Sequence, residues 1–369
     1  MKNNKSRRNF ISKIALGVTT MAVPSKILAN SNNKEKIKKS IIKQEALGFQ
    51  WNTADPFLFC VHHEDFYPKG DSSLGPKKED LIGRNIGQDF VVKDGWRMYH
   101  GETIPGFPAH PHRGFETLTI VRKGIVDHAD SLGASGRYGG GDVQWLTAGS
   151  GVQHSEMFPL VNQDKDNTME LFQIWLNLPS HKKFSTPSYK MFWANDIPKK
   201  IIKVKNGKEI EIEVIAGDFE DKIAINPPVN SWAADKNNGL AVWIIKLKAE
   251  AEWTLPAGLK DLNRTLYFYD GKSLELDGES ISPYHSVTLL SDRDVVLKSG
   301  NTEVKLLMLQ GRPINEPVVH QYGPFVMNTK EEIKQAFIDY QKDNFGGWKW
   351  ESAGQTHGDR KRFSDFIEE

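Results

Sequence analysis

Four side chains in two short motifs have the types and the spacing of a metal site. His110 and His112 are separated by one proline, and His154 and Glu156 are separated by one serine. Because alternate side chains of a β-strand point to one face, the two members of each pair project together. If the two segments are neighbouring strands of one barrel, three imidazoles and a carboxylate converge inside it. Neutral imidazole with carboxylate suits first-row divalent metals such as iron, nickel, copper or zinc.

A set of hydrogen-bonded histidines in a polar core is the alternative, and for one histidine it would be the better interpretation. Two such pairs about 42 residues apart, with glycine-rich turns between them, favour the metal. The identity of the carboxylate ligand is undecided, because Glu116 is a second candidate. It lies four positions after His112, on the same face if the strand is unbroken. Many cupins take all three ligands from one segment spaced in this way. Spacing alone does not choose between Glu116 and Glu156.

Composition excludes several other kinds of site. The chain has 369 residues and a formal net charge of +1, whereas nucleic-acid binders normally carry a strong basic excess. Its only cysteine, Cys60, excludes an internal disulfide framework and any zinc or iron–sulfur site built on cysteines. Histidines and carboxylates are therefore the side chains on which a functional hypothesis must rest.

The segments that have to position these side chains have the pattern of β-strands. From about residue 48 to 325, apolar runs rich in β-branched and aromatic residues alternate with Gly, Pro, Asn and Asp. No long stretch with helical periodicity interrupts them, so we expect an all-β core. The clearest runs are 117–121, 171–176, 241–245, 286–290 and 304–309.

These runs gather in two clusters, which predicts two β-barrel domains in tandem. We expect an N-terminal metal-binding barrel at 48–182 and a C-terminal barrel at 183–326, each of ordinary domain size. His285 is the only histidine between residues 190 and 310, so we expect no metal in the second barrel.

The C-terminal part has a different pattern. A capping box begins at Thr329, and Ile333, Ala336 and Tyr340 follow at helical spacing. This predicts a C-terminal helix at 327–345. The glycine-containing, charged segment after it, 346–369, is expected to be a loose tail.

The N-terminus has the three parts of an export signal. Basic residues without any acid precede a mildly apolar stretch at 14–23, which is too short to span a bilayer. The pair Arg7 and Arg8, followed by a lysine that closes the motif, resembles the signal read by the twin-arginine export machinery. We therefore expect a signal peptide at 1–29, a flexible spacer at 30–47, and a periplasmic or exported protein without stable membrane insertion.

Cleavage of this leader would remove six basic residues and change the net charge from +1 to −5. The mature chain is then still further from the charge of a nucleic-acid binder. Proteins exported by this route fold, and often take up a cofactor, before export. That history fits both a metal site and a chain that has a single cysteine.

Several long motifs resemble those of one known family, the pirins, which are bicupins. The segments that carry the likeness are HPHRGFET at 110–117, GDVQWLTAG at 141–149, GVQHSEM at 151–157, QIWLNL at 173–178 and YGPFVMN at 322–328. The resemblance covers about residues 50–345. It implies two tandem cupin barrels of the jelly-roll type with a C-terminal helix.

The resemblance also implies a ligand set. Carried over motif by motif, the ligands are His110, His112, His154 and Glu156, usually around Fe(II). Nickel, cobalt, manganese or copper would also suit these side chains. Glu116 is then expected to support the ligands from behind or to line the pocket, and it ranks below Glu156.

Several bacterial pirins act as quercetin 2,3-dioxygenases, so the resemblance implies an enzyme that cleaves a flavonol or related aromatic substrate with O2. Separately from the resemblance, we expect a monomer. Glu156 is expected to accept the proton of the flavonol hydroxyl. One alternative is a periplasmic metal-dependent binding or redox-sensing protein without turnover. Another is a cupin isomerase or hydrolase that acts on a different small molecule.

One segment departs from the pirin pattern. Residues 59–65 read FCVHHED, whereas the family usually has a short acidic segment there, so we expect a different pocket rim. His62, His63 and the later His100 are candidates for the mouth of the pocket. Histidines at such positions are more commonly surface residues.

Overall fold

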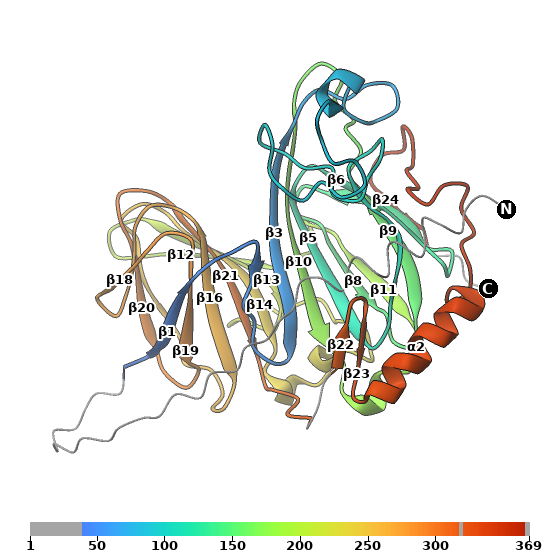
Figure 1. Cartoon of the computed structure of the whole chain (residues 1–369). Coiled ribbons are helices and arrows are strands. Elements are labelled where there is room, and N and C mark those ends of the chain that lie inside the picture. Colours follow the sequence, from blue (N-terminus) through green and yellow to red (C-terminus); the bar gives the residue numbers. More distant parts are fainter. Residues whose placement is uncertain (1–38, 317–319, 366–369) are drawn as a thin grey trace.

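The computed structural model describes residues 39–316 and 320–365, which form two β-barrels lying side by side (Figure 1). Each barrel consists mainly of two facing sheets, and one helix, α2 (Lys330–Asp343), lies against the first barrel (Figure 1). The expected all-β bicupin with a C-terminal helix is confirmed. The leader expected at 1–29 lies outside the described residues. Among the described residues, no helix has the length and apolarity of a membrane span.

The first barrel contains both metal motifs. Its strands are β2 (Gln50–Trp51), β3 (Phe57–Tyr67), β4 (Gly106–His112), β5 (Phe115–Lys123), β6 (Ile125–Asp130), β7 (Ser135–Gly139), β8 (Val143–Thr147), β9 (Val152–Met157), β10 (Asn167–Asn177), β11 (Ser188–Phe192) and β24 (Phe363–Asp365). The larger sheet has the order β11-β8-β5-β10-β3-β2, and the smaller sheet has the order β24-β7-β6-β9-β4.

The second barrel has an apolar interior. Its strands are β1 (Ile41–Ala46), β12 (Lys199–Lys203), β13 (Glu209–Ala216), β14 (Ala241–Leu247), β15 (Glu252–Leu255), β16 (Asn263–Asp270), β17 (Leu274–Leu276), β18 (Glu279–Ile281), β19 (His285–Leu290), β20 (Val295–Ser299) and β21 (Val304–Gly311). They form a seven-stranded sheet, β1-β19-β16-β21-β14-β13-β12, and a four-stranded sheet, β15-β20-β17-β18. Buried aliphatic and aromatic side chains from both sheets pack between them.

The larger sheets of the two barrels pack against each other. Leu118 on β5 and Val242 on β14 are buried in the same apolar cluster, and Trp51 stacks on Tyr267 with ring centroids 5.0 Å apart. Because side chains alternate along β5, the neighbouring Thr119 points to the interior of the first barrel instead, where it contacts Glu156. Each position on β5 therefore belongs either to the interface between the barrels or to the interior.

Helix α2 begins at Lys330, directly after the predicted capping residue Thr329, and is shorter than the expected span of 327–345. Thr329 accepts a hydrogen bond from the backbone N–H of Glu332, and the Glu332 side chain accepts one from the backbone of Thr329, which completes the capping box. Tyr340 of α2 donates a hydrogen bond of 2.6 Å to Gln153 on β9. A hairpin of β22 (His320–Tyr322) and β23 (Phe325–Met327) precedes the helix. The remaining helical turns are η1 (Lys78–Leu81), η2 (Ser180–Lys182), η3 (Trp232–Ala234) and η4 (Lys236–Asn238).

The start of the described chain differs from the expected spacer. Residues 41–46 form β1, which pairs with β19 at the edge of the second barrel, so that Gln44 lies opposite Val287. The polar residues of this segment are accommodated because an edge strand exposes one of its faces. The boundary expected at residue 183 also differs, because β11 pairs with β8 in the first barrel.

The tail after α2 is not loose as far as residue 365. It runs over the first barrel and ends in β24, which pairs with β7 (Figure 1). Arg137 on β7 donates hydrogen bonds of 2.7 and 2.6 Å to the carbonyls of Gly358 and Arg360. The backbone carbonyl of Ala353 accepts a bond of 2.7 Å from Ala109, the residue before His110. The many charged residues of this segment led to the expectation of a loose tail. Its backbone instead hydrogen-bonds to both edges of the smaller sheet, at β7 and at β4.

Candidate metal centre

Two neighbouring strands bring the histidine motifs together. β4 and β9 are antiparallel partners, and His110 lies directly opposite His154 in their register. His112 lies two residues further along β4 and therefore on the same face as His110. The sequence expectation that the two motifs occupy adjacent strands of one barrel therefore agrees with their placement.

The three imidazoles form a compact group. Each offers a ring nitrogen, and these nitrogens lie within 4.8 Å of one another. The ring centroids of His110 and His154 are 4.5 Å apart, and those of His112 and His154 are 4.9 Å apart. Glu156 comes close to the same group, with its Oε2 atom 3.8 Å from Nε2 of His154. All four side chains are buried.

The protonation of the histidines suits a divalent cation. Burial lowers the pKa of His110 to about 4, and it holds the pKa values of His112 and His154 well below their usual range. The rings are therefore neutral at pH 7, and each keeps a lone pair. Within the described residues, neither ring nitrogen of His154 has a hydrogen-bond partner. Buried polar atoms are rarely left unpaired, so this donor set fits a metal that completes it.

Glu156 is held by a hydroxyl inside the barrel. The Thr119 hydroxyl lies 2.9 Å from Oε1 of Glu156 and 2.8 Å from the side-chain oxygen of Gln173. A hydroxyl has one proton, so Thr119 donates to the Glu156 carboxylate when the Gln173 amide turns its NH2 toward the hydroxyl. Burial raises the pKa of Glu156, whereas the Thr119 hydrogen bond opposes that rise.

Glu116, expected behind the ligands or in the pocket, lies elsewhere. Gly114 adopts a φ of +85° and separates β4 from β5, so the strand that would have aligned Glu116 with His112 is broken. Glu116 accepts hydrogen bonds from Thr147 (2.7 Å), Trp145 (3.2 Å) and Ser231 (2.6 Å). Ser231 belongs to the loop before β14, so Glu116 bridges the two barrels.

A cavity of about 410 Å³ opens onto the ligand group. Its volume lies within the range of small-molecule sites, roughly 300–1,000 Å³. Rings dominate its lining, and Trp175 packs 5.3 Å from His112 and 4.4 Å from Phe115, measured between ring centroids. The principal lining residues are Phe49, Phe59, His63, Phe90, His100, Phe107, His110, His112, Glu156, Phe158, Gln173 and Trp175.

The remaining histidines separate by strand face. His63 on β3 and His100 on the loop before β4 line the cavity. His62 points to the opposite side of β3, where it stacks on Phe172 in the interface between the barrels. Period-2 alternation predicts that one of two adjacent histidines faces inward, but it does not say which one.

His128 also lies close to the ligand group, although it belongs to neither metal motif. It lies on β6 opposite Glu156, and its ring centroid is 5.5 Å from that of His154. Nε2 of His128 lies 3.2 Å from a carboxylate oxygen of Asp130. The spacing of His128 and Asp130, two residues apart on one strand, is the sequence feature that could have indicated their common face.

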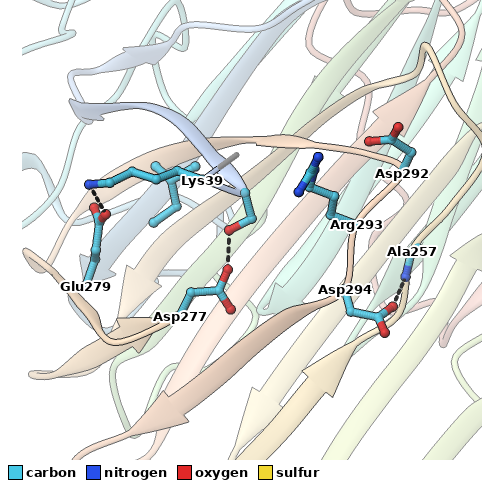
Figure 2. Close-up of a pocket in the computed structure, with 9 residues that line it drawn as sticks. Lys39, Ala257, Asp277, Glu279, Asp292, Arg293 and Asp294 are labelled. Carbon is cyan, nitrogen blue, oxygen red and sulfur yellow. Dashed lines mark hydrogen bonds and ion pairs between the residues drawn. The ribbon is translucent and has the colours of Figure 1, made fainter. Parts of the chain in front are cut away.

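A second hollow lies on the second barrel around the first described residues (Figure 2). Three of its acidic side chains have partners within the protein. Glu279 forms an ion pair of 2.6 Å with Lys39, Asp277 accepts a hydrogen bond from Ser40, and Asp294 accepts one from the backbone of Ala257. The contacts of Lys39 and Ser40 hold the segment before β1 against the second barrel, whereas the Asp294 contact lies within that barrel.

Comparison with known proteins assigns the chain to a family. The family profile described as Pirin matches residues 43–176, and the profile described as Pirin C-terminal cupin domain matches residues 242–346. The chain belongs to the pirin family. This pirin is 39% identical over 243 residues to a Pseudomonas aeruginosa protein provisionally named quercetin 2,3-dioxygenase, with 65% of this chain and 79% of that protein covered. It is 37% identical over 244 residues to Pirin-1 of Arabidopsis thaliana, with 65% and 78% covered.

Solved structures show the same architecture. The pirin superposes on a crystal structure of quercetin 2,3-dioxygenase from Acinetobacter baumannii with a TM-score of 0.64 and 27% identity, covering 84% of this chain and 98% of that chain. The expected family is confirmed. The strand β24 lies beyond residue 346, where the second family profile ends.

Proposed function

We propose that this protein is a metal-dependent dioxygenase that cleaves a flavonol or a related aromatic substrate with O2. The observation that carries the proposal is the placement of His110, His112 and Glu156 in the wall of a cavity lined mainly by aromatic rings. Such a cavity accepts a planar aromatic substrate and brings it next to the metal-binding side chains. Similarity to a solved quercetin 2,3-dioxygenase structure supports this reaction class.

We infer that His110, His112, His154 and Glu156 hold one divalent transition metal, with Fe(II) as the first candidate. Neutral imidazoles and a carboxylate also accept nickel, cobalt, manganese or copper. A metal held by these four side chains would act as a Lewis acid toward an oxygen of the substrate. The register of β4 against β9 sets the spacing of the histidines before any metal binds.

Glu156 is the proposed base. Its carboxylate lines the cavity next to the histidines, where a substrate hydroxyl can reach it, and a positioned carboxylate is a common general base. Glu156 takes the proton from the flavonol hydroxyl as the substrate enters. Thr119 holds the carboxylate in place while Trp175 and the surrounding rings exclude water from the ligand.

The test is anaerobic reconstitution with Fe(II), Ni(II), Mn(II), Co(II) and Cu(II), each followed by measurement of O2 uptake with quercetin. We expect uptake with at least one metal, and loss of both the metal and the uptake in His112→Ala. Loss of an outer-shell partner alone typically costs 10–100-fold in metal affinity, so loss of a ligand should cost more than about 100-fold. Tight metal binding without O2 uptake for any metal would contradict the dioxygenase proposal.

We also propose that the protein is exported and acts in the periplasm. The support is the twin-arginine pattern at Arg7 and Arg8, which precedes the described part of the chain. Uptake of the metal in the cytoplasm before export would follow from that route.

A further inference from the structure

A second polar group lies in the cavity, away from the metal motifs. His63 on β3 is only 4% exposed, and its imidazole lines the same cavity as His110. The Phe107 ring neighbours both histidines, with centroids 6.0 Å from His63 and 6.3 Å from His110. His63 thus borders the cavity, and the Phe107 ring lies next to both His63 and the candidate metal ligand His110.

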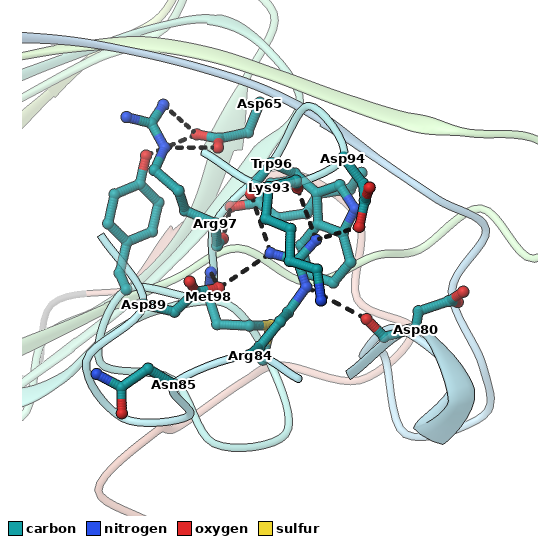
Figure 3. A network of polar contacts seen from close by, with 12 residues as sticks. Asp65, Asp80, Arg84, Asn85, Asp89, Lys93, Asp94, Trp96, Arg97 and Met98 are labelled. Atoms are coloured by element: carbon teal, nitrogen blue, oxygen red, sulfur yellow. Dashed lines mark hydrogen bonds and ion pairs between the residues drawn. The ribbon is translucent and has the colours of Figure 1, made fainter. Parts of the chain in front are cut away.

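A buried chain of hydrogen bonds stands behind His63. Its Nδ1 atom lies 2.7 Å from the Tyr99 hydroxyl, which donates a bond of 2.6 Å to Oδ2 of Asp65. Arg97 donates to both oxygens of Asp65, with distances of 2.9 and 3.1 Å (Figure 3). All four side chains are buried, so water does not compete for these bonds.

The proton count along this chain fixes the form of the imidazole. A tyrosine hydroxyl has one proton, and Tyr99 gives it to Asp65, so Tyr99 can only accept from His63. The proton of the neutral ring therefore lies on Nδ1. Burial holds the pKa of His63 well below its usual range, and Arg97 and His62 lower it further, so the ring carries no second proton. Nε2 of His63 is left as a hydrogen-bond acceptor.

Within the described part of the chain, no hydrogen bond to Nε2 of His63 is found, although the ring borders the cavity. Its orientation is nonetheless fixed, because Tyr99 meets it edge-on with centroids 4.9 Å apart. Phe49, a cavity residue from the start of the barrel, also meets it edge-on at 6.1 Å. An oriented acceptor with no protein partner, in a wall made mostly of aromatic rings, is suited to a ligand that donates a hydrogen bond.

The loop that carries Tyr99 is itself anchored. Arg84 donates to the carboxylate of Asp89 (3.0 Å) and to the carbonyls of Lys93 (2.7 Å) and Trp96 (3.0 Å), and its guanidinium lies over the Trp96 ring (Figure 3). Asp89 in turn accepts from the backbone of Met98, the residue before Tyr99. The position of the Tyr99 hydroxyl is therefore set by the folded loop as well as by His63.

We propose that Nε2 of His63 accepts a hydrogen bond from a hydroxyl of the substrate, which makes the cavity selective for phenolic ligands that carry a donor away from the metal. Tyr99 and Asp65 act as positioning residues that hold His63 in its Nδ1-protonated form. This inference rests on the proposed function in taking the cavity as the substrate site.

The test uses the full mature protein loaded with Zn(II), which is diamagnetic, and two probes, phenol and anisole. The probes differ in that only phenol has a donor hydroxyl. Two-bond 15N–1H spectra of 15N-histidine protein report the tautomer of His63, and titration reports binding at its Nε2 resonance. We expect an Nδ1-protonated ring, a shift of Nε2 with phenol only, and phenol binding about three- to tenfold tighter than anisole binding, as for one neutral hydrogen bond.

Variants separate a direct role from a structural one. His63→Leu should abolish the preference for phenol, whereas His62→Leu, the adjacent histidine on the other face of β3, should retain it. Tyr99→Phe keeps the ring and removes the hydroxyl, so it should give a mixed tautomer and a smaller preference. A loss of packing alone would not change the tautomer.

Two results would overturn the inference: a proton on Nε2 of His63 in the wild type, or equal binding of phenol and anisole. The outcome is separable from that of the proposed function. If phenol shifts Nε2 but quercetin is not consumed with any metal, the dioxygenase proposal fails and the role of His63 stands. If quercetin is consumed at the same rate by wild type and His63→Leu, and phenol does not shift Nε2, the reverse holds.

Discussion

His110 and His154 lie directly opposite each other on the antiparallel strands β4 and β9, with ring centroids 4.5 Å apart. The candidate metal site therefore depends on the register in which β4 pairs with β9. A shift of one residue in this pairing would turn one histidine pair to the other face of the sheet. Because β9 is buried and the histidine-bearing end of β4 is buried as well, the register is strongly specified.

Glu156→Gln should separate proton transfer from shape. The amide has nearly the volume of the carboxylate and still accepts a hydrogen bond from Thr119, but it does not accept a proton at neutral pH. We expect kcat for quercetin to fall by about 10²–10⁴-fold, the usual contribution of a general base, when rates are measured per bound metal. A variant that retains full turnover per metal would exclude Glu156 as the base.

Arg137→Ala should destabilise the first barrel. Arg137 forms two short bonds to the fully buried carboxylate of Asp127 and also holds the carbonyls of Gly358 and Arg360. Removing one partner of a buried ion pair leaves an uncompensated charge, so we expect a loss of about 3–5 kcal/mol in the free energy of unfolding, measured by urea denaturation.

Arg360→Ala is the matched control for that measurement. The Arg360 side chain forms an ion pair with Asp365, but both side chains are about half exposed. Such surface pairs contribute about 0–1 kcal/mol. Equal losses for Arg137→Ala and Arg360→Ala would contradict the buried ion pair as the anchor of the tail.

The interface between the barrels should make stability depend on pH through Glu116. Burial raises the pKa of Glu116 to about 7 from an ordinary 4.5, so the folded protein binds a proton that the unfolded chain has lost. Its contribution is fully present below pH 4.5 and is lost as the pH rises through 7. Relative to Glu116→Gln, the wild type should lose about 3 kcal/mol between pH 4.5 and 8. Denaturation curves of the two proteins that remain parallel over this range would rule out the raised pKa.

The export proposal can be tested on the intact precursor. Replacing both arginines of the twin motif, Arg7→Lys with Arg8→Lys, keeps the charge and removes the paired guanidinium groups. We expect the precursor to remain in the cytoplasm, while the wild type is found in the periplasm after cell fractionation. Unchanged periplasmic recovery of the double variant would argue against the twin-arginine route.

The parts of the site that could be predicted from sequence are those set by local geometry. Alternation along a strand is enough to place His110 and His112 on one face, and His154 and Glu156 on one face. The placement of Glu116 failed because it assumed that one strand continued through Gly114. A side chain at Gly114 would lie 2.0 Å from the carbonyl oxygen of Val326, so the turn depends on a hairpin more than 200 residues away.

The polar chain behind His63 could not be predicted for a similar reason. Arg97 and Tyr99 lie 30 and 32 residues after the end of β3, on an irregular loop whose path is determined by Arg84 and Asp89. No periodicity relates such residues to one another. The tail and β1 were misjudged because polar edge strands look like linkers when their partners are unknown.

The pairing of β1 with β19 has a consequence for biogenesis. Ser286 on β19 hydrogen-bonds to Glu45 on β1, across 241 positions of the chain. The second barrel therefore acquires its edge strand only after most of the polypeptide has been synthesised, and contacts at such long range form late. The segment that precedes β1 remains attached to an unpaired strand until then. Completion of the second barrel therefore depends on a strand that is synthesised more than 200 residues before its partner.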